Sequence, residues 1–309
     1  MLQENAVVVN LLVDNMVKKG YYIHQCSFTV AEGSDSIEHI NRLITSNIKQ
    51  INHLQSIESL ICNANGRITD SLEILRIDNQ ILLLGNLEAS KETRKLIVSG
   101  IHWNEDVRIM NGDGILTKVS FIGTKKDLVD IIPVGKMIIE DNKWAIWGEY
   151  YVKILDIEDI SKIDIILKSS EIEKILEDIP SGYEKLEEKD WREFRVFNGI
   201  LSFEEYKHNL LPSELGLDML VDLKKGCYPG QEIHARMESR GKLKKKISRF
   251  KSNKDIELGK YRSKNGERIN VTTSLGKTGF FLINDFEDEI LIIDDIELRH
   301  EELNSIKIC

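Results

Sequence analysis

The chain has little cysteine and no long apolar stretch, and each shortage excludes a class of protein. Its four cysteines, among 309 residues, are widely separated and form no CxxC pair, which argues against a disulfide framework or a metal site built from cysteine alone. Apolar runs such as 81–84 and 290–293 are far shorter than the roughly 20 residues that a membrane span requires. We therefore expect reduced thiols and no transmembrane segment.

The amino terminus also lacks the features of a targeting sequence. Residues 1–5 read M-L-Q-E-N, without a basic start or an apolar core, so we expect neither a secretory signal nor a transit peptide. A cytoplasmic location is the prediction that follows. A content of 41% hydrophobic and 30% charged residues is typical of a soluble globular protein, and the length predicts two or three domains.

Basic residues are in the minority except in one strip. The net charge is -9, yet residues 236–251 hold eight Lys/Arg and one Glu, a local charge of +7 that leaves -16 for the rest. Such a strip could bind nucleic acid, an acidic partner or an anionic ligand. An equally good interpretation is a solvated strand whose lysines protect a sheet edge. Its only aromatic residue is Phe250, which does not support stacking on single-stranded nucleic acid.

The first half of the chain has the patterns of mixed helix and strand structure. Asp35 with Glu38 forms a capping-box pattern ahead of a helix whose apolar face runs to Ile48. Alternating or continuous apolar runs bounded by turn residues predict strands. The remaining predicted segments are helices at 11–19 and 88–98, strands at 22–30, 59–63, 68–77 and 80–84, and a strand group at 128–155 with a bend at 141–142.

The second half changes from helix to strand after Gly241. A second capping-box pattern, Ser170 with Glu173, predicts a helix that ends before Pro180. Short strands predict a small all-β domain at the carboxy terminus, and they lie at 242–250, 267–273, 279–283 and 290–299. Trp144 and Trp147 have the spacing of opposite strand faces, so we expect one indole in the core.

One short stretch carries the clearest chemical signal. Residues 224–236 read K-K-G-C-Y-P-G-Q-E-I-H-A-R, in which Pro-Gly predicts a type II turn and residues 231–240 a short helix ending at Gly241. Cys227 then stands just ahead of a helix start, where backbone N–H groups and the preceding lysines favour thiolate over thiol. The alternative is the usual one for a free cysteine, a buried and inert filler, and no nearby His-Asp pair marks a nucleophile. His24 and Cys26 could share a strand face, but we prefer ordinary packing to a metal site there.

The same stretch resembles a family motif. Residues 225–232, K-G-C-Y-P-G-Q-E, match the K-G-C-Y-x-G-Q-E signature of the YgfZ-type folate-binding proteins, which support iron–sulfur enzyme maturation and tRNA modification. Further similarity lies in the order expected of that family and covers most of the chain, thinly between residues 87 and 190. The similar segments are 33–35 (G-S-D), 43–47 (L-I-T-S-N), 62–68 (C-N-A-N-G-R-I), 195–200 (R-V-F-N-G-I), 211–217 (L-P-S-E-L-G-L) and 276–279 (G-K-T-G).

The resemblance implies an architecture. The wider superfamily includes the T-protein of the glycine cleavage system, an aminomethyltransferase that uses tetrahydrofolate. The implied fold is α+β, with two α/β subdomains in a ring around a folate channel and a small carboxy-terminal β-barrel. The expected division is a folate-binding core of two subdomains at 1–240, with their continuity in sequence left open, and a barrel domain at 241–309.

Two positions depart from the enzyme of this superfamily. The T-protein pattern R-L-E-A-G-x corresponds to residues 195–200, and this chain has Phe197 at the position of the folate-contacting Glu. The T-protein pattern G-G-I-x-D-D corresponds to residues 66–71, and this chain keeps the first acid as Asp70 but has Ser71 in place of the second. The donor-rich edge of a pterin is best met by a carboxylate, and losing one charge-assisted hydrogen bond costs about 1.5 to 3 kcal/mol. Aminomethyl transfer is therefore the second hypothesis, and catalysis of any kind is left open.

The leading hypothesis is a tetrahydrofolate-binding protein that assists iron–sulfur enzyme maturation or repair. Cys227 would be the functional residue at or near the channel mouth, with iron–sulfur client proteins as partners, no metal bound by the protein itself and no membrane contact. A tRNA-modification accessory role, through weak tRNA contact at residues 236–251, is a third hypothesis. The candidate cofactor-binding residues that the resemblance implies are Asn63, Asp70, Asn86, Lys225, Gly226, Tyr228, Gly230, Gln231, Glu232 and Arg236.

Several of these residues have simpler structural interpretations. Glu232 in a first helical turn is favoured by the helix dipole whatever the function, and Arg236 is its i,i+4 neighbour. Tyr228 beside a turn is more often packing than a stacking platform. Asp70 could equally be an acid at a strand edge.

Overall fold

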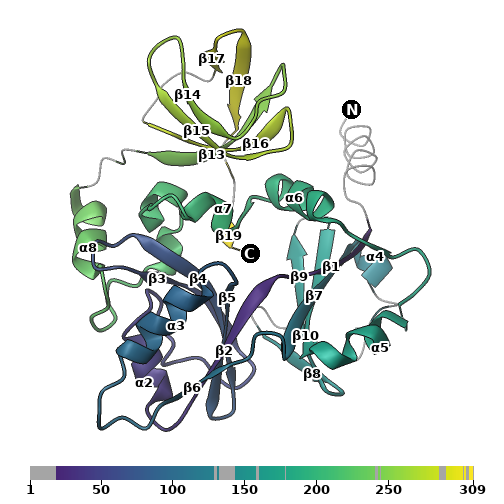
Figure 1. Ribbon diagram of the computed structural model, residues 1–309, viewed down its shortest axis with the longest axis vertical. Helices are drawn as coiled ribbons and strands as arrows, with labels where there is room; N and C mark the ends of the chain where they lie inside the picture. The colour runs from purple at the N-terminus through teal and green to yellow at the C-terminus, as the bar shows by residue number, and fades with distance from the viewer. Residues whose placement is uncertain are drawn as a thin grey trace, which may run out of the picture.

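The structure is a computed structural model that describes residues 19–128, 131, 143–157, 160–177, 179–240, 243, 245–284, 290–301, 303 and 306–308. Two sheets lie side by side, each with helices on its outer side, and a third, curled sheet lies above them in the view of Figure 1. No helix in the described part of the chain is both long and apolar enough to cross a membrane.

The first sheet has five antiparallel strands in the order β3-β4-β5-β2-β6. The strands are β2 (Cys26–Glu32), β3 (Ser56–Cys62), β4 (Ile68–Ile77), β5 (Gln80–Asn86) and β6 (Arg108–Asn111), and its helices are α2 (Ser36–Asn41) and α3 (Ser90–Ser99). Consecutive β3, β4 and β5 form a meander because turns at 65–66 and 78–79 reverse the chain.

The second sheet has the order β11-β1-β7-β10-β9-β8 and is antiparallel except for β1 with β11. Its strands are β1 (Gly20–Ile23), β7 (Leu116–Gly123), β8 (Ala145–Trp147), β9 (Tyr150–Ile157), β10 (Ile160–Lys168) and β11 (Glu184–Lys185). The helices beside it are α4 (Lys125–Leu128), η2 (Ser169–Glu171), α5 (Ile172–Glu177) and α6 (Glu188–Phe197).

The rest of the chain connects these sheets to the curled one. It contains β12 (Ile200–Leu201), α7 (Phe203–Tyr206), η3 (Pro212–Leu215), η4 (Asp218–Leu220) and α8 (Gln231–Arg240). The third sheet, in the order β14-β15-β16-β13-β18-β17, is formed by β13 (Lys246–Ser252), β14 (Gly259–Arg262), β15 (Arg268–Ser274), β16 (Thr278–Ile283), β17 (Ile290–Ile293) and β18 (Ile296–Glu301). The last strand, β19 (Lys307–Ile308), returns to pair in parallel with β12.

The first sheet is buried on both faces, because its helices cover one face and the second sheet lies against the other. Leu83 packs under the helices with Ile97, whereas the alternate residues Leu82 and Leu84 pack with Trp144 beside the second sheet. Because side chains alternate along a strand, this near-continuous apolar run covers both faces. Each such side chain contributes roughly 1.5 to 3 kcal/mol on burial. The polar space described below lies between the two sheets.

Several predicted elements are confirmed and several are wrong. The helix at 231–240 and the three strands of the meander are present, and Trp144 is the buried indole, at 1% exposure. Predicted strand 22–30 is two strands, β1 and β2. The predicted helix at 11–19 and the bend at 141–142 lie outside the described residues, apart from residue 19.

Both capping-box predictions are wrong in detail. The helix after Asp35 ends at Asn41, and Asp35 makes no side-chain cap; its Oδ2 instead accepts from Asp106 N at 2.8 Å. Long-range pairing therefore competes successfully with the local cap. After Lys168 a 3-10 turn comes first, and the α-helix begins at Ile172.

Candidate functional site

The loop that precedes α8 and contains Cys227, called the cysteine loop below, exposes its thiol and is held by hydrogen bonds on both sides. Cys227 is exposed to solvent and stands before the Pro229-Gly230 turn that starts α8. Gly230 has φ +83, the left-handed conformation that a type II turn needs at its third position. The predicted turn and helix therefore present the sulfur at the surface.

Lys225 holds the start of the loop. Its ammonium group donates to the backbone carbonyls of Asn41, Ile44 and Ser46 at 2.6, 2.8 and 2.7 Å. All three donors of a lysine are thereby used, on the carbonyls at and just beyond the end of α2. Burial lowers the pKa of Lys225 to about 8. This lysine, predicted as a cofactor contact, holds the loop against the first sheet and its helices.

Tyr228 and His234 hold the other side. His234 Nε2 donates to Gly66 O at 2.8 Å, which leaves Nδ1 to accept from the Tyr228 hydroxyl at 3.3 Å. Burial lowers the pKa of His234 and raises that of Tyr228, so both are neutral near pH 7. The phenol is 7% exposed, which makes Tyr228 part of the packing of the loop.

The remaining residues predicted near the loop either form hydrogen bonds within the turns or lie exposed to solvent. Gln231 Nε2 reaches the carbonyls of Leu223 and Lys225 at 3.3 and 3.4 Å. Glu232 and Arg236 form an exposed ion pair at 2.9 Å. Asn63 Oδ1 accepts two backbone N–H groups of its own β3–β4 turn. The structure thus gathers the predicted residues of 225–236 with the Asn63 turn, through the close approach of Gly66 and Gly230.

Asp70 and Asn86 form a separate pair at the facing ends of β4 and β5. Asp70 is completely buried and accepts from Asn86 N at 3.2 Å, from Asn86 Nδ2 at 2.7 Å and from Thr93 Oγ1 at 2.7 Å. Burial raises the pKa of Asp70 to about 6. Ser71 shares a hydrogen bond with Tyr206 at 2.5 Å. Of these residues, Asn86 lines the pocket described next.

That pocket lies between the two sheets and is rich in ionisable side chains. Its enclosed free volume is about 100 Å³, and strands of both sheets, α6 and the β12–β19 pair contribute to its wall. Lys118, Lys153 and Lys162 come from the second sheet, and Glu58 and Glu73 from the first. None of these five residues was predicted as part of a site.

Ion pairs satisfy most of the charges in the pocket. Lys153 lies 2.8 Å from Glu73, while Lys118 and Lys162 lie 3.3 and 2.9 Å from Asp164. Burial acts to raise the pKa of both acids, but Lys153 and Lys118 lower that of Glu73 to about 2, and Lys118 and Lys162 lower that of Asp164 further still. Both carboxylates are therefore ionised at neutral pH.

Glu58 and His24 differ from the paired groups. The Glu58 carboxylate has no hydrogen bond or ion pair to any described residue, and burial, followed by repulsion from Glu73, raises its pKa. His24 bonds through Nε2 to Ser120 Oγ at 2.7 Å, and burial, followed by Lys118, holds its pKa well below the usual value. Glu58 is thus a hydrogen-bond acceptor aimed into a polar pocket with its capacity unused.

A sequence signal for these residues exists in hindsight. Along β7, Lys118 and Ser120 alternate with buried apolar residues, and along β10 Lys162 and Asp164 do so. Strands with charged residues on one face and core residues on the other are expected where a polar pocket meets a sheet. These two central strands were not predicted, so their polar faces were overlooked.

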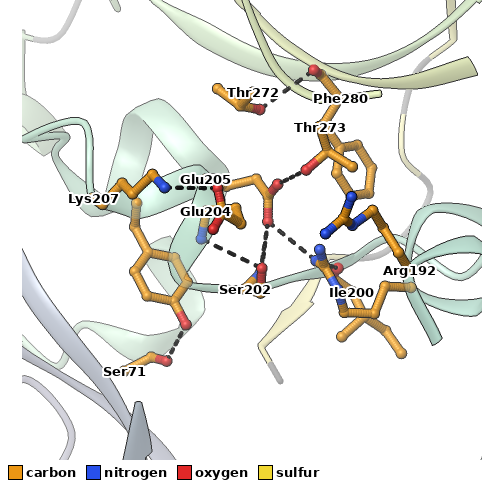
Figure 2. A network of polar contacts seen from close by, with 12 residues as sticks. Ser71, Arg192, Ile200, Ser202, Glu204, Glu205, Lys207, Thr272, Thr273 and Phe280 are labelled. Atoms are coloured by element: carbon orange, nitrogen blue, oxygen red, sulfur yellow. Dashed lines mark hydrogen bonds and ion pairs between the residues drawn. The ribbon is translucent and has the colours of Figure 1, made fainter. Parts of the chain in front are cut away.

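The segment at 195–200 connects the sheets through a buried network. Arg195, 3% exposed, donates to Glu205 Oε2 at 3.1 Å and to Ile200 O at 2.9 Å. Figure 2 shows Glu205 between Ser202 and Thr273 of β15, and both donate to it. Phe197 packs against the Trp191 cluster that borders the pocket, so this position contributes an apolar ring to that cluster.

Comparison with known proteins settles the fold. No protein-family model matches the chain. A crystal structure of glycine cleavage system aminomethyltransferase T from Bartonella henselae superposes with a TM-score of 0.81, covering 94% of this chain and 87% of that chain at 14% identity. The fold is that of the T-protein. The predicted α+β class is confirmed, and the T-protein-like core carries a curled carboxy-terminal sheet.

The sequence relative agrees with the predicted resemblance. The iron-sulfur cluster assembly factor IBA57 homolog, mitochondrial, of Dictyostelium discoideum is 26% identical over 245 residues. The match covers 70% of this chain but only 58% of that relative's length. The chain is thus similar in sequence to a protein named as an iron–sulfur cluster assembly factor, which agrees with the resemblance seen at residues 225–232. A heterotetrameric sarcosine oxidase from Corynebacterium sp. U-96 is only remotely similar, at TM-score 0.29 and 9% identity over 54% of this chain and 89% of that chain.

Proposed function

We propose that this protein binds tetrahydrofolate and assists the maturation or repair of iron–sulfur enzymes, with Cys227 as its reactive group. The observation that carries the proposal is the exposed thiol on a loop fixed by Lys225 and by the Tyr228–His234–Gly66 chain. A thiol held in this way is accessible to a partner's sulfur or metal, and its position is set before the partner arrives. Homology to an assembly factor and the T-protein fold support the rest.

The polar pocket fits one end of a folate in its chemistry. A pterin presents a row of N–H donors, and Glu58 offers an unused carboxylate beside Asn86. Its enclosed volume of about 100 Å³ is below the range of roughly 300–1,000 Å³ usual for whole ligands, so the rest of the molecule would lie in the open mouth. Bound folate would supply one-carbon chemistry at N5 or N10.

The side chains of the chain itself would do the binding. Glu58 would accept from the ligand, Asp70 would orient Asn86 through two hydrogen bonds, and the lysines would favour an anionic tail near the mouth. Cys227 is not among the residues that line the described pocket. Its place at the channel mouth therefore remains a prediction, and the proposal treats thiol and pocket as separable parts.

Titration with tetrahydrofolate tests the binding part. We expect a heat or fluorescence change that saturates, and Glu58→Gln should weaken binding about tenfold or more, the equivalent of about 1.5 kcal/mol for a charge-assisted hydrogen bond. Glu92→Gln, an exposed change on α3, should bind as the wild type does. Absence of any signal at millimolar ligand would overturn the folate assignment.

Aminomethyl transfer is the second candidate, because the superposed T-protein is an aminomethyltransferase. Against it stand Asp70, whose carboxylate is buried and bonded within the protein, and Ser71, whose hydroxyl is bonded to Tyr206. Formation of methylene-tetrahydrofolate from an aminomethylated carrier or a methylated amine would establish it. A lack of product across such donors favours the assembly role.

The tRNA contact at 236–251 and the cytoplasmic location remain predictions. Part of the strip is already paired, since Arg236 lies 2.9 Å from Glu232 and Lys251 lies 2.6 Å from Glu301. Retardation of tRNA that falls steeply with salt would support the contact. The curated relative is named as mitochondrial, so localisation by fractionation is a separate test.

A further inference from the structure

Another cavity lies at the curled sheet, and Lys245 is its only described lining residue among those predicted as functional. It has a free volume of about 560 Å³, within the range of roughly 300–1,000 Å³ usual for small-molecule sites. Its wall is formed by the β14–β16 end of the curled sheet, by Lys245 ahead of β13 and by His208 after α7. Among its described lining residues are four Lys or Arg and no Asp or Glu, namely Lys245, Lys260, Arg262 and Arg268. We call this cavity the basic groove.

Strand register explains how the cations come together. In the β14–β15 pair, Lys260 lies opposite Asn270 and Arg262 lies opposite Arg268. Positions two apart point to the same side of a strand, so Lys260, Arg262, Arg268 and Asn270 share one face of the sheet. Ile269, between two of them, belongs to the core of the sheet. The groove is therefore set by the sheet itself rather than by long flexible loops.

The cations are unusually poor in internal partners. No described carboxylate pairs with any of the four, and Arg262 makes only a hydrogen bond at 3.4 Å to Gly266 O. Like charges directly opposite on paired strands destabilise a sheet. Lysine on an edge strand can serve to block edge pairing, which accounts for Lys260 on β14. It does not account for Arg268, on the second strand, or for Lys245 across the groove.

The charge pattern favours a compact anion over a long one. The whole chain carries -9, which opposes a nucleic-acid backbone at long range, whereas a small anion within about 10 Å at 0.1 M salt feels chiefly the four local cations. Two arginines side by side match phosphate oxygens through paired N–H groups. From this geometry we infer that the basic groove binds an oligophosphate of two or three linked phosphates, free or carried by a nucleotide.

Calorimetric titration with tripolyphosphate and with ATP, both without metal, tests the assignment on the full-length protein. We expect saturable 1:1 binding of at least one of them, and at least a tenfold loss of affinity in the Arg262→Gln/Arg268→Gln double variant. Arg299→Gln is the matched control, because Arg299 is an exposed cation of the same sheet outside the groove. Thermal unfolding checks that the double variant remains folded.

The outcomes separate the possible ligands. Binding of both compounds identifies the phosphate chain as sufficient, and binding of ATP alone identifies a nucleotide source; both support the inference if the double variant loses it. Equal affinity in the double variant and the wild type, or no binding of either compound at millimolar concentration, overturns it. Tight binding of a single-stranded RNA oligomer without binding of either small compound also overturns it, since the groove would then be a nucleic-acid surface.

Discussion

Burial of the Asp70 carboxyl group makes the stability of the fold depend on pH. Asp70 lies at 0% exposure and accepts hydrogen bonds from Asn86 and Thr93. Its pKa of about 6 exceeds the ordinary value of 3.8 because of that burial. A raised folded-state pKa means that the stability due to protonated Asp70 is complete below about pH 4 and is lost as the pH rises through about 6.

Asp70→Asn should remove that pH dependence. The wild type is expected to lose about 3 kcal/mol of unfolding free energy between pH 4 and pH 7 through this group, from about 1.4 kcal/mol per pKa unit, and the variant is not. Urea unfolding at both pH values measures the difference, with Glu92→Gln as an exposed control. A wild-type-minus-variant difference that stays constant between the two pH values would contradict the assignment.

Residue types near the site were predicted where local chemistry decides them. Proline and glycine beside Cys227 predicted the turn before the helix at 231–240, because turn geometry depends on neighbours in sequence. Whether the sulfur is buried or exposed was left open, and the structure shows it exposed. Lys225 was assigned to the ligand, whereas its ammonium group binds carbonyls of residues 41, 44 and 46. That partner choice depends on contacts about 180 residues apart in sequence, which no local pattern contains.

At the scale of the element, two tight turns meet at Gly66 and Gly230. A Cβ on Gly230 would lie 2.4 Å from Gly66 Cα, and Gly230 has φ +83. The two turns meet through backbone atoms at this contact, so neither can shift without a cost in free energy. The short distance between these elements is what brings α8 against the first sheet.

Gly230→Ala should therefore destabilise the protein by about 2 kcal/mol or more, from left-handed strain of roughly 1 to 3 kcal/mol plus the steric overlap. Gly226→Ala is the matched control in the same loop, because a Cβ there meets nothing within 4 Å. Chemical denaturation of both variants measures the effect. Equal stability of the two variants would show that the contact between turns is not rigid.

Helices and strands were predicted best where the sequence signals for their start and end lie next to them. The helix at 231–240 has a turn before it and a glycine after it, and its bounds agree with α8. β7 and β10 were missed because Lys118, Ser120, Lys162 and Asp164 interrupt their apolar runs. Lys118, Lys162 and Asp164 line the pocket between the sheets, so the polar residues of the site are the reason that these strands were not predicted.

Over the whole molecule, the curled sheet is attached to the core by buried polar contacts. Glu205 of α7, at 0% exposure, accepts from Thr273 of β15 (Figure 2). The same carboxylate pairs with Arg195 of α6. Arg249 of β13 donates to the carbonyl of Phe197 at 2.7 Å. We propose the division into 1–240 and 241–309 as the domain arrangement, with these contacts and the β12–β19 pair holding the two parts together.

Glu205→Gln should cost about 3 kcal/mol of unfolding free energy, since it leaves the buried Arg195 charge without its partner. Glu204→Gln, its neighbour on α7, removes only a half-exposed pair with Lys207 and should cost under about 0.5 kcal/mol. Urea unfolding followed by tryptophan fluorescence compares the two. Similar losses for both variants would mean that Glu205 does not carry this attachment.

The overall architecture was predicted from a family resemblance, not from periodicity. Residues 225–232 and the segments that accompany them implied a T-protein-like ring with a terminal β-domain, and the fold agrees. Local patterns alone predicted strands and helices but not the pairing of β1 with β7 or of β12 with β19, because such pairings depend on long-range packing that one sequence does not display.

The central claim is that the thiol performs the chemistry while the fold binds the folate. Cys227→Ser, assayed both for tetrahydrofolate affinity and for restoring iron–sulfur enzyme activity in cells lacking this protein, tests it most directly. Cys62→Ala is the control, since burial raises the pKa of Cys62 to about 12 and keeps it inert. We predict unchanged folate affinity with lost restoration for Cys227→Ser; full restoration by that variant would contradict the account.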